Sequence, residues 1–432
     1  MDKNELKKKI CAAIDAQSER LIGIGKKIWE NPEPGYEEYK TSALIQDEFK
    51  ALDLPYKAGM ARTGVRADLD TGKAGPAIAV LGEMDALIMP ENPAADPVTH
   101  AAHACGHNMQ VTAMLGAAMG LSAVPEVKEL LSGKIAFIAC PAEECRIAEH
   151  EGVKYIGGKA ELIRQGVFDD IQISFMTHAN SRGYGAAQTC NGFIMKKVLF
   201  HGLAGHCGRP WVGINALSAA RLALDAVDMQ RDLFQDDDCV RIHGIFQKAG
   251  SVVNIVPEET ELEYQIRAMR PEAIREASEM FDRSIRGAAV AFGLKAEIVT
   301  YAGYMPLYNE PELLKIHRDN LKIQRPNETF LDAGKSTGST DMGDVSSIMP
   351  AIHPYTGGWA GTGHQSSFHW IDDRETFVDP GKILAMDAVD LLFGDASEGK
   401  RIAAIKPKFT KAEYLAYLDS FMSEEKIDGT AR

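Results

Sequence analysis

Short apolar runs alternate with helix-like segments up to about residue 190. Three runs have the length and composition of buried strands: AIAVLGEM (77–84), KIAFIAC (134–140) and IQISFMTH (171–178). Amphipathic segments flank them and predict helices near 15–30, 41–52, 109–123 and 153–165. Strands that are apolar throughout are typical of a sheet with helices on both faces. The pattern therefore predicts an α/β fold with a mixed sheet covered by helices.

The order of elements changes between residues 191 and 303. Strand-like runs are expected at 192–200, 239–247, 259–268 and 295–302, and helix-like segments at 215–231 and from Pro271 onward. Strand, helix, strand, strand, helix, strand is the split-βαβ order of a ferredoxin-like α+β domain. Beyond it, helices near 311–323 and 380–394 and a strand near 348–353 rejoin the first pattern. We therefore expect one domain built from 1–190 and 304–432, with 191–303 inserted.

Composition and charge restrict the partners. The chain has 432 residues, of which 45% are hydrophobic and 25% charged, and a net charge of −14. This acidity argues against nucleic acid, because phosphate binding needs clustered Lys and Arg. The N-terminal segment lacks the apolar core of a signal peptide, and no run approaches the ~18 apolar residues of a membrane span. Seven cysteines, an odd number, favour reduced thiols. We expect a cytoplasmic protein without a membrane partner.

The segment AAHACGHNMQ (101–110) carries the strongest chemical signal. Cys105 and His107 stand two residues apart, just before a helical run that starts near Met109. This spacing suits a loop that holds a metal ion from two sides, and thiolate and imidazole are good ligands for zinc and other first-row ions. A buried free cysteine beside a hydrogen-bonded core histidine is the structural alternative. A thiol–imidazole nucleophile is a third interpretation.

Acidic residues and a histidine follow three of the predicted strands. Glu143 and Glu144 come after the run at 134–140, and His178 closes the run at 171–178. The carboxyl ends of such strands are where α/β sheets usually place their sites. Asp85, which follows the run at 77–84, suits a partner that orients a metal-ligating histidine. Glu83 lies on the same face of the strand as Asp85, and the pattern assigns it no role. An exposed acidic turn and a structural histidine are the alternatives.

Beyond these local patterns, the sequence resembles the M20 metallopeptidase superfamily, and in particular its amidohydrolase branch of aminoacylase-, carboxypeptidase- and aminobenzoyl-glutamate hydrolase-like enzymes. The likeness extends from WENPEPGYEEYKTSALI (29–45) to HQSSF (364–368). It rests on the ordered motifs MDAL, HACGHN, PAEE, TH, AGHCGRP, NIVP, QIRA, GSTDMGD and HQSSF. The resemblance implies a metal-binding catalytic domain and an inserted domain that serves as lid and dimerisation surface.

The resemblance also implies roles for matching residues. One or two divalent ions, most often zinc or manganese, would be held by Cys105, His107, Glu144, His178 and His364. His369 lies close enough to His364 to rival it as the last ligand. Glu143 would be the general base, and Asp85 keeps its expected role of orienting a metal-ligating histidine. His206 would reach into the partner subunit of a homodimer and hold the oxyanion, and Asn254 and Arg267 would lie near the substrate carboxylate.

The implied reaction is hydrolysis of an N-acyl or N-aroyl amino acid, with Glu143 moving the proton of the attacking water. A small molecule with an amide next to a free carboxylate is the expected substrate. A dipeptidase or carboxypeptidase that uses the same metal site is the second interpretation. A catalytically inactive binding subunit is the third, and the presence of Glu143 and all the candidate ligands disfavours it.

Overall fold

The computed structural model describes residues 1–144, 146–148 and 150–430, and the chain forms two compact units. The first unit comprises 1–189, 307–336 and 341–411, and the second comprises 190–306, 337–340 and 412–432. Within the described ranges, no helix combines the length and the apolar character that crossing a lipid bilayer requires. The cytoplasmic location stays a prediction.

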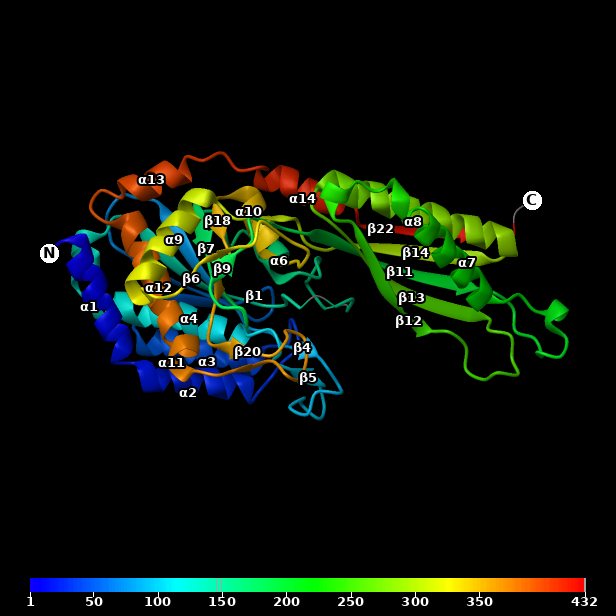
Figure 1. The fold of residues 1–432 in the computed structure, drawn as a ribbon, viewed down its shortest axis with the longest axis horizontal. Helices are drawn as coiled ribbons and strands as arrows, with labels where there is room; N and C mark the ends of the chain where they lie inside the picture. The colour runs from blue at the N-terminus through cyan, green and yellow to red at the C-terminus, as the bar shows by residue number, and fades with distance from the viewer. Residues whose placement is uncertain (145, 149, 431–432) are drawn as a thin grey trace. The chain divides into compact units, whose positions relative to one another are not determined.

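A six-stranded mixed sheet forms the centre of the first unit (Figure 1). Its order is β1 (Tyr56–Met60), β2 (Gly64–Asp70), β6 (Lys134–Cys140), β3 (Ala77–Glu83), β7 (Ile173–Phe175) and β18 (Ala351–Ile352). The pairs β6–β3, β3–β7 and β7–β18 are parallel, whereas β1–β2 and β2–β6 are antiparallel. The carboxyl ends of β3, β6 and β7 therefore meet at one edge, which positions the candidate site.

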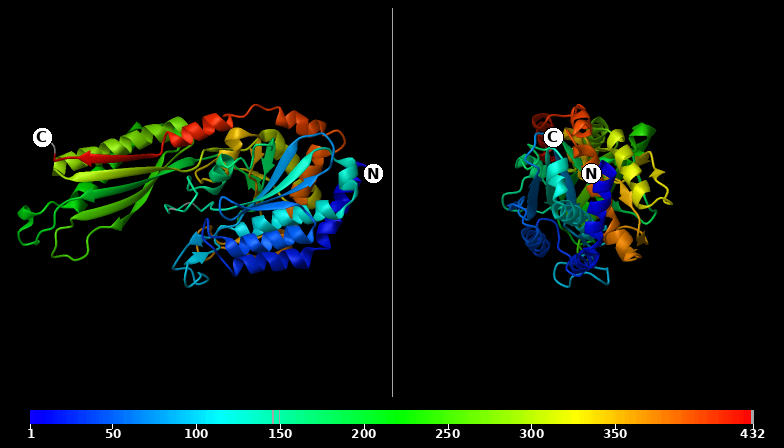
Figure 2. Two further views of the ribbon diagram at one scale, coloured as in Figure 1. Left: turned by 180° about the vertical axis from the view of Figure 1, so that it is seen from behind. Right: turned by 90° about the vertical axis from the view of Figure 1, so that its left-hand side faces the viewer.

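Helices cover both faces of this sheet (Figures 1 and 2). A Cβ on Gly82 would lie 2.9 Å from the Gln110 carbonyl oxygen of α4 (His107–Ala123), while the next residue, Glu83, contacts Lys159 of α6 (Gly158–Arg164). Because neighbouring strand residues face opposite sides, α4 and α6 lie on opposite faces of β3. From His107 to Leu121 every residue of α4 is buried, as expected for a helix that is apolar on all sides.

The other helices of the first unit are α1 (Lys3–Asp15), α2 (Ser18–Trp29), α3 (Tyr39–Ala51), α5 (Glu126–Leu130), α9 (Pro311–Gln324), α10 (Met342–Ile348), α11 (Asp373–Phe377), α12 (Asp379–Leu392) and α13 (Ser397–Ala403). Short two-residue strands include β8 (His178–Ala179), β19 (Tyr355–Thr356), β20 (Trp359–Ala360) and β21 (His369–Trp370). The predicted run at 171–178 is thus divided between β7 and β8. The expected helix near 153–165 forms only as α6, because Gly157 is its N-cap and Gly158 its first residue, and two consecutive glycines disfavour an earlier start.

The second unit contains an antiparallel sheet with two helices on one face (Figure 1). Along the chain it consists of β11 (Gly192–His201), α7 (Ala216–Met229), β12 (Arg241–Lys248), β13 (Glu259–Ala268), α8 (Pro271–Phe292) and β14 (Lys295–Ala302). In the sheet these strands lie in the order β12-β13-β11-β14, which is the ferredoxin-like arrangement. The predicted fold class is confirmed.

The C-terminal segment departs from the expected division. The pattern assigned 304–432 to the first domain, but α14 (Lys411–Asp419) leads to β22 (Ser423–Asp428), which pairs with β14. Phe421 is buried in the core of the second unit, and Arg286 of α8 donates to Glu425 at 2.6 Å. The strand SEEKID is largely exposed and polar, so it has no hydrophobic pattern to reveal it. Its backbone hydrogen bonds to the edge strand β14 place it in the sheet of the second unit.

Candidate metal centre

The candidate residues converge because three parallel strands end at the same edge of the sheet. Glu83 at the end of β3 is in register with Cys140 at the end of β6. The Glu144 amide, four residues after Cys140, donates to Asp85 Oδ2 at 2.7 Å. His178 begins β8, three residues beyond the end of β7. Strand topology therefore brings together side chains that lie far apart in the sequence.

A glycine turn places Cys105 and His107. Gly106 adopts a left-handed conformation (φ +95°), and a Cβ at this position would lie 2.3 Å from the Ala179 Cβ. Only glycine satisfies both conditions. The helix α4 begins at His107, two residues earlier than the sequence predicted, because the turn at Gly106 is itself the helix N-cap. His107 therefore occupies a rigid first helical position.

Asp85 orients His107. The Nδ1 atom of His107 lies 2.9 Å from the Asp85 carbonyl oxygen and 3.1 Å from Asp85 Oδ1, and both side chains are buried. Both oxygens are acceptors, which assigns the proton to Nδ1. The Nε2 lone pair then faces the opposite side, toward Glu83, Glu143 and Glu144. A carboxylate behind a histidine is the usual support of a metal ligand.

Three groups of donor atoms converge here, with all atoms in each group within 4.8 Å of one another: Cys105, His107 and His178; Cys105, Glu144 and His364; Glu83, His107 and Glu143. Cys105 Sγ lies 3.2 Å from His178 Nε2, and His364 Nε2 lies 3.6 Å from Glu144 Oε1. Within the described residues, no converging group contains His369, whose Nδ1 contacts the Ser367 carbonyl oxygen at 2.7 Å. The geometry thus favours His364 over His369.

Two non-glycine residues with left-handed backbone support this arrangement. His364 has φ +63°, and its amide donates to the Ala104 carbonyl oxygen at 2.8 Å, which anchors it beside Cys105. Ala142 has φ +49°, and its amide donates to buried Glu38 at 2.8 Å. Each such residue costs about 1 kcal/mol or more. Backbone strain therefore coincides with the two segments that carry His364 and the pair Glu143–Glu144.

Unpartnered buried atoms show that a cation fits the site. His107 Nε2, Glu83 Oε2 and Glu144 Oε1 are buried and have no hydrogen-bond partner. Buried polar atoms without partners are costly, and each of these atoms can donate a lone pair to a metal ion. Sulfur, nitrogen and carboxylate donors together suit zinc or another first-row divalent ion.

The electrostatics of the site agree with this interpretation. Burial, together with the charges of Glu83 and Glu144, raises the pKa of Glu143 well above its usual range. Burial and the charge of Glu144 raise the pKa of the Cys105 thiol in the same direction. Burial lowers the pKa of His178 to about 4, so its imidazole is neutral. Several acidic groups thus compete for positive charge, and a divalent ion can replace their protons.

Sequence reasoning missed a second set of buried polar residues at this edge. Lys159 of α6 forms ion pairs with Glu83 and Asp341, and all three side chains are fully buried. His353, which follows β18, is also buried, and its ring centroid lies 5.2 Å from that of His178. The motif GSTDMGD drew attention to the segment that holds Asp341. Lys159 had no such signal, because a lysine in a short helix is normally exposed.

The candidates in the second unit lie at two ends of its sheet. His206 forms a β-bridge with Ile255, and the Cys207 amide donates to the Asn254 carbonyl oxygen at 3.0 Å, so His206 and Asn254 belong to neighbouring loops. Both loops adjoin the Glu259 end of β13. Arg267 lies at the other end, eight residues or about 27 Å along the strand at about 3.4 Å per residue. Within one copy of this unit, Arg267 and His206 therefore lie at opposite ends of the sheet.

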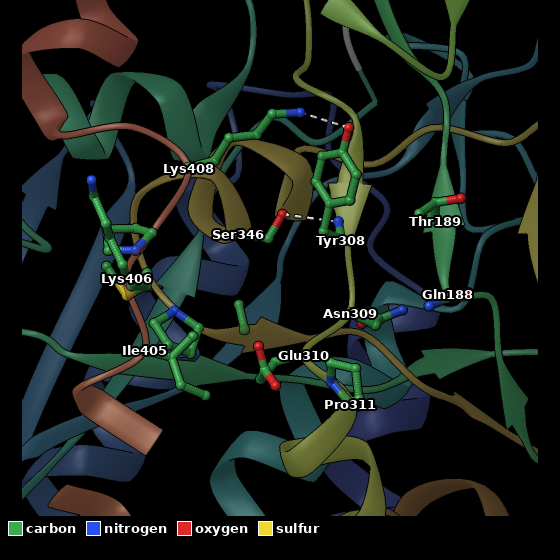
Figure 3. A pocket seen from close by; sticks show the side chains of 14 residues that line it. Gln188, Thr189, Tyr308, Asn309, Glu310, Pro311, Ser346, Ile405, Lys406 and Lys408 are labelled. Atoms are coloured by element: carbon green, nitrogen blue, oxygen red, sulfur yellow. Dashed lines mark hydrogen bonds between the residues drawn. The ribbon is translucent and has the colours of Figure 1, made fainter. Parts of the chain in front are cut away.

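A separate pocket of about 280 Å³ lies in the first unit beside β18 (Figure 3). In it, the Lys408 ammonium donates to the Tyr308 hydroxyl at 2.7 Å, and the Tyr308 amide donates to Ser346 Oγ at 3.2 Å. Its lining residues include none of the converging donor atoms described above. The side chains of Lys408, Tyr308 and Ser346 are hydrogen-bonded within the pocket, as the dashed lines in Figure 3 show. This pocket is therefore a weaker candidate for the active site than the edge of the sheet.

Comparison with known proteins decides the family. The model of peptidase family M20/M25/M40 matches residues 79–378, which is more than half of the chain. The chain belongs to this peptidase family. It is therefore a metal-dependent hydrolase that acts on linear amides, as the sequence resemblance implied. The matched range contains the edge of the sheet with its converging donors, and it also contains the whole ferredoxin-like insertion.

Individual relatives of this M20-family hydrolase agree with the assignment. It is 30% identical over 416 residues to a mouse (Mus musculus) protein named Xaa-Arg dipeptidase, with 90% of each chain covered. It is 26% identical over 358 residues to the N-acetyl-L-cysteine deacetylase of Bacillus subtilis strain 168, with 80% of this chain and 82% of the relative covered. The fold matches that of a Bacillus subtilis protein described as a dinuclear metal-binding peptidase of the M20 family, with a TM-score of 0.67, 22% identity and coverage of 88% and 99%.

Proposed function

We propose that this M20 hydrolase cleaves the amide bond of N-acyl amino acids, in which the amide nitrogen belongs to an amino acid with a free carboxylate. The observation that carries the proposal is the convergence of His107 Nε2, Glu83 Oε2 and Glu144 Oε1, all buried and unpartnered, beside Glu143. An ion at this position and a carboxylate next to it are the two components that water-based amide hydrolysis needs.

The metal would be zinc or manganese, held by Cys105, His107, Glu144, His178 and His364. Two of the converging groups share Cys105, so the donors present could hold one or two ions. A bound divalent ion lowers the pKa of its water from about 15.7 to about 7 and polarises the carbonyl group. Asp85 keeps His107 in the tautomer whose Nε2 lone pair faces the ion.

Glu143 would take the proton from the attacking water and deliver it to the leaving nitrogen. Its position, buried at the same edge and within one converging group with Glu83 and His107, supports this role. A general base of this kind contributes about 10²–10⁴-fold in rate. Replacement of Glu143 by glutamine should therefore abolish most turnover while leaving the donors for the ion in place.

His206 would donate a hydrogen bond to the oxyanion. The Gly208 amide donates to His206 Nδ1 at 3.0 Å, which leaves Nε2 of this exposed side chain as the hydrogen-bond donor. Arg267 would bind the substrate carboxylate through its guanidinium. Because Arg267 lies at the opposite end of β13 from His206 and Asn254, one substrate can meet all three only if His206 and Asn254 come from a second copy.

A mixing experiment tests this homodimer model. Glu143→Gln and His206→Ala are each expected to be nearly inactive, but a mixed dimer contains one site with Glu143 from one subunit and His206 from the other. Random exchange makes about half of the dimers mixed, with one intact site of two, so about a quarter of wild-type activity should return. If His206 acts within its own chain, mixing restores nothing. In that case the trans model is wrong, and the hydrolase assignment is unaffected.

A dipeptidase is the second candidate, and the relative named Xaa-Arg dipeptidase favours it, since it matches at 30% identity over 90% of both chains. The two candidates differ in the group on the acyl side. The discriminating measurement is kcat/KM for N-acetyl-arginine against alanyl-arginine, which share a C-terminal residue. A preference for the acetylated compound supports the acylase, whereas a preference for alanyl-arginine makes the chain a dipeptidase.

Metal content is the primary test of the centre. Elemental analysis of protein purified without chelator should find one or two equivalents of zinc, manganese or a similar ion, and less in Cys105→Ala. Wild-type protein that contains no such ion and takes up none when it is added would overturn the proposed mechanism.

A further inference from the structure

Lys159 is a buried cation next to the proposed metal centre. Its side chain is fully buried, and its ammonium donates to Glu83 Oε1 and to Asp341 Oδ1. Its backbone amide donates to the second oxygen of Asp341, Oδ2, at 3.0 Å. Asp341 thus holds Lys159 at both the backbone and the side chain, and Lys159 in turn holds one oxygen of Glu83.

The other oxygen of Glu83 faces the centre. Glu83 Oε2 has no hydrogen-bond partner and lies 3.3 Å from His107 Nε2. Two atoms bound to one first-row ion at about 2.1 Å are about 3.0 to 3.4 Å apart for angles between octahedral and tetrahedral. The separation of 3.3 Å between Glu83 Oε2 and His107 Nε2 falls within this range, so one ion could bind both atoms.

We propose that Lys159 is a positioning residue for the metal centre, which together with Asp341 holds Glu83 as an additional oxygen donor for the ion at His107. The inference rests on the proposed metal centre and deepens it. Neither Lys159 nor Asp341 contacts the ion in this arrangement; both act through the orientation of the Glu83 carboxylate. Supporting residues of this kind typically change metal affinity by about 10–100-fold.

Electrostatics alone predicts the opposite change in metal affinity when Lys159 is removed. An ammonium beside a cation site repels the ion, so removal of Lys159 would strengthen metal binding through the Coulomb term alone. If Lys159 positions Glu83, its removal frees that carboxylate to rotate away and weakens binding. The sign of the change in affinity therefore separates the two views.

Cobalt(II) titration is the test, because its ligand-field bands report coordination and its thiolate band reports Cys105. For Lys159→Met we expect Co²⁺ affinity at least about tenfold lower than wild type, with the thiolate band retained and the ligand-field bands changed. Glu83→Gln should show the same change, and Glu83→Gln/Lys159→Met should bind no more weakly than Glu83→Gln alone, because both act through one carboxylate. Lys196→Met, a second buried lysine outside the centre, is the matched control and should leave Co²⁺ affinity unchanged.

The outcomes are distinguishable. Wild-type protein that binds no Co²⁺ would contradict the metal centre itself. Wild-type protein that binds Co²⁺ while Lys159→Met binds it equally or more tightly would overturn the positioning role and leave the centre intact. If Lys159→Met does not fold, Asp341→Asn decides, since asparagine can still accept from the Lys159 amide. A Co²⁺ affinity and ligand-field spectrum equal to wild type in Asp341→Asn would also overturn the inference.

Discussion

Lys159 in the first unit and Lys196 in the second are both buried, yet their surroundings differ. Lys196 of β11 contacts one carboxylate, Asp282, at 2.8 Å and the Thr300 hydroxyl at 2.9 Å. Lys159 contacts two carboxylates, and one of them, Glu83, belongs to a converging donor group. Burial lowers the pKa of Lys196. For Lys159 burial acts in the same direction, but the charges of Asp341 and Glu83 outweigh it and raise the pKa well above its usual range.

The two buried lysines differ in how their charge is balanced by the carboxylates around them. In the second unit a single ion pair lies in a ferredoxin-like core, and its charges cancel. In the first unit the charge of Lys159 is exceeded by the carboxylates around it, and several acceptor atoms remain without partners. The Lys196–Asp282 pair balances its own charges, whereas the excess of buried carboxylates in the first unit must be met by protons or by a bound cation. The contrast supports the proposed metal centre in the first unit.

The largest expected effect comes from Glu143. Glu143→Gln should lower kcat/KM by about 10³-fold, within the range of a lost general base, with metal content unchanged. The steady-state rate and elemental analysis of the same preparation check this. Glu297→Gln, a partly exposed substitution in the second unit, should change neither quantity. Full activity in Glu143→Gln would contradict its assigned role.

Metal binding should stabilise the first unit selectively. At a free metal concentration 100 times Kd, binding adds about 2.7 kcal/mol to the free energy of unfolding. Trp29, Trp359 and Trp370 belong to the first unit and Trp211 to the second, so fluorescence of a Trp211→Phe variant follows the first unit alone. We expect addition of zinc to raise its unfolding temperature, and Cys105→Ala to suppress that rise. If zinc raises the unfolding temperature of Trp211→Phe/Cys105→Ala as much as that of Trp211→Phe, the ion binds elsewhere.

Removal of Lys196 should lower stability without affecting metal. Lys196→Met leaves Asp282 without its cation, which should cost about 3 kcal/mol in the free energy of unfolding. Urea denaturation followed by circular dichroism measures this loss. Lys196→Met/Asp282→Asn should recover part of it, because the uncompensated charge is gone. A change in metal content in either variant would break the contrast between the two lysines.

The smallest effect concerns a partly exposed ion cluster of the first unit, formed by Arg66, Lys134 and Asp170. Hydrogen bonds from Arg66, and also from Lys134, hold the pKa of Asp170 below its usual range. Because the folded pKa is lowered, the stabilisation is present above the unfolded value of 3.8 and is lost as pH falls below it. Asp170→Asn should therefore cost about 1 kcal/mol or less at pH 7, because the Asp170 side chain is 46% exposed. Urea midpoints of wild type and variant should approach each other below about pH 4. A pH-independent difference would mean that Asp170 acts through packing.

Much of the architecture follows from local pattern. The strands at 77–83 and 134–140, and all six elements of the ferredoxin-like insertion, were expected within a few residues of their observed bounds. Their hydrophobic periodicity is strong because one or both faces are buried. The prediction that chemistry lies at strand ends also follows, since parallel strands share an edge. The convergence of Cys105, His107, Glu144 and His178 then depends on strand order and on the turn at Gly106, whereas His364 is brought beside them by a loop whose amide donates to the Ala104 carbonyl oxygen.

Other features required the tertiary structure. The pairing of β22 with β14 joins residues more than a hundred positions apart through backbone hydrogen bonds, to which a polar edge strand contributes no hydrophobic signal. Lys159 meets Glu83 and Asp341 across separations of 76 and 182 residues. Sequence alone determined which residues have the chemistry to bind a metal and where strands end. Only the fold decided which of them are buried without partners, because burial depends on what packs against each side chain from distant parts of the chain.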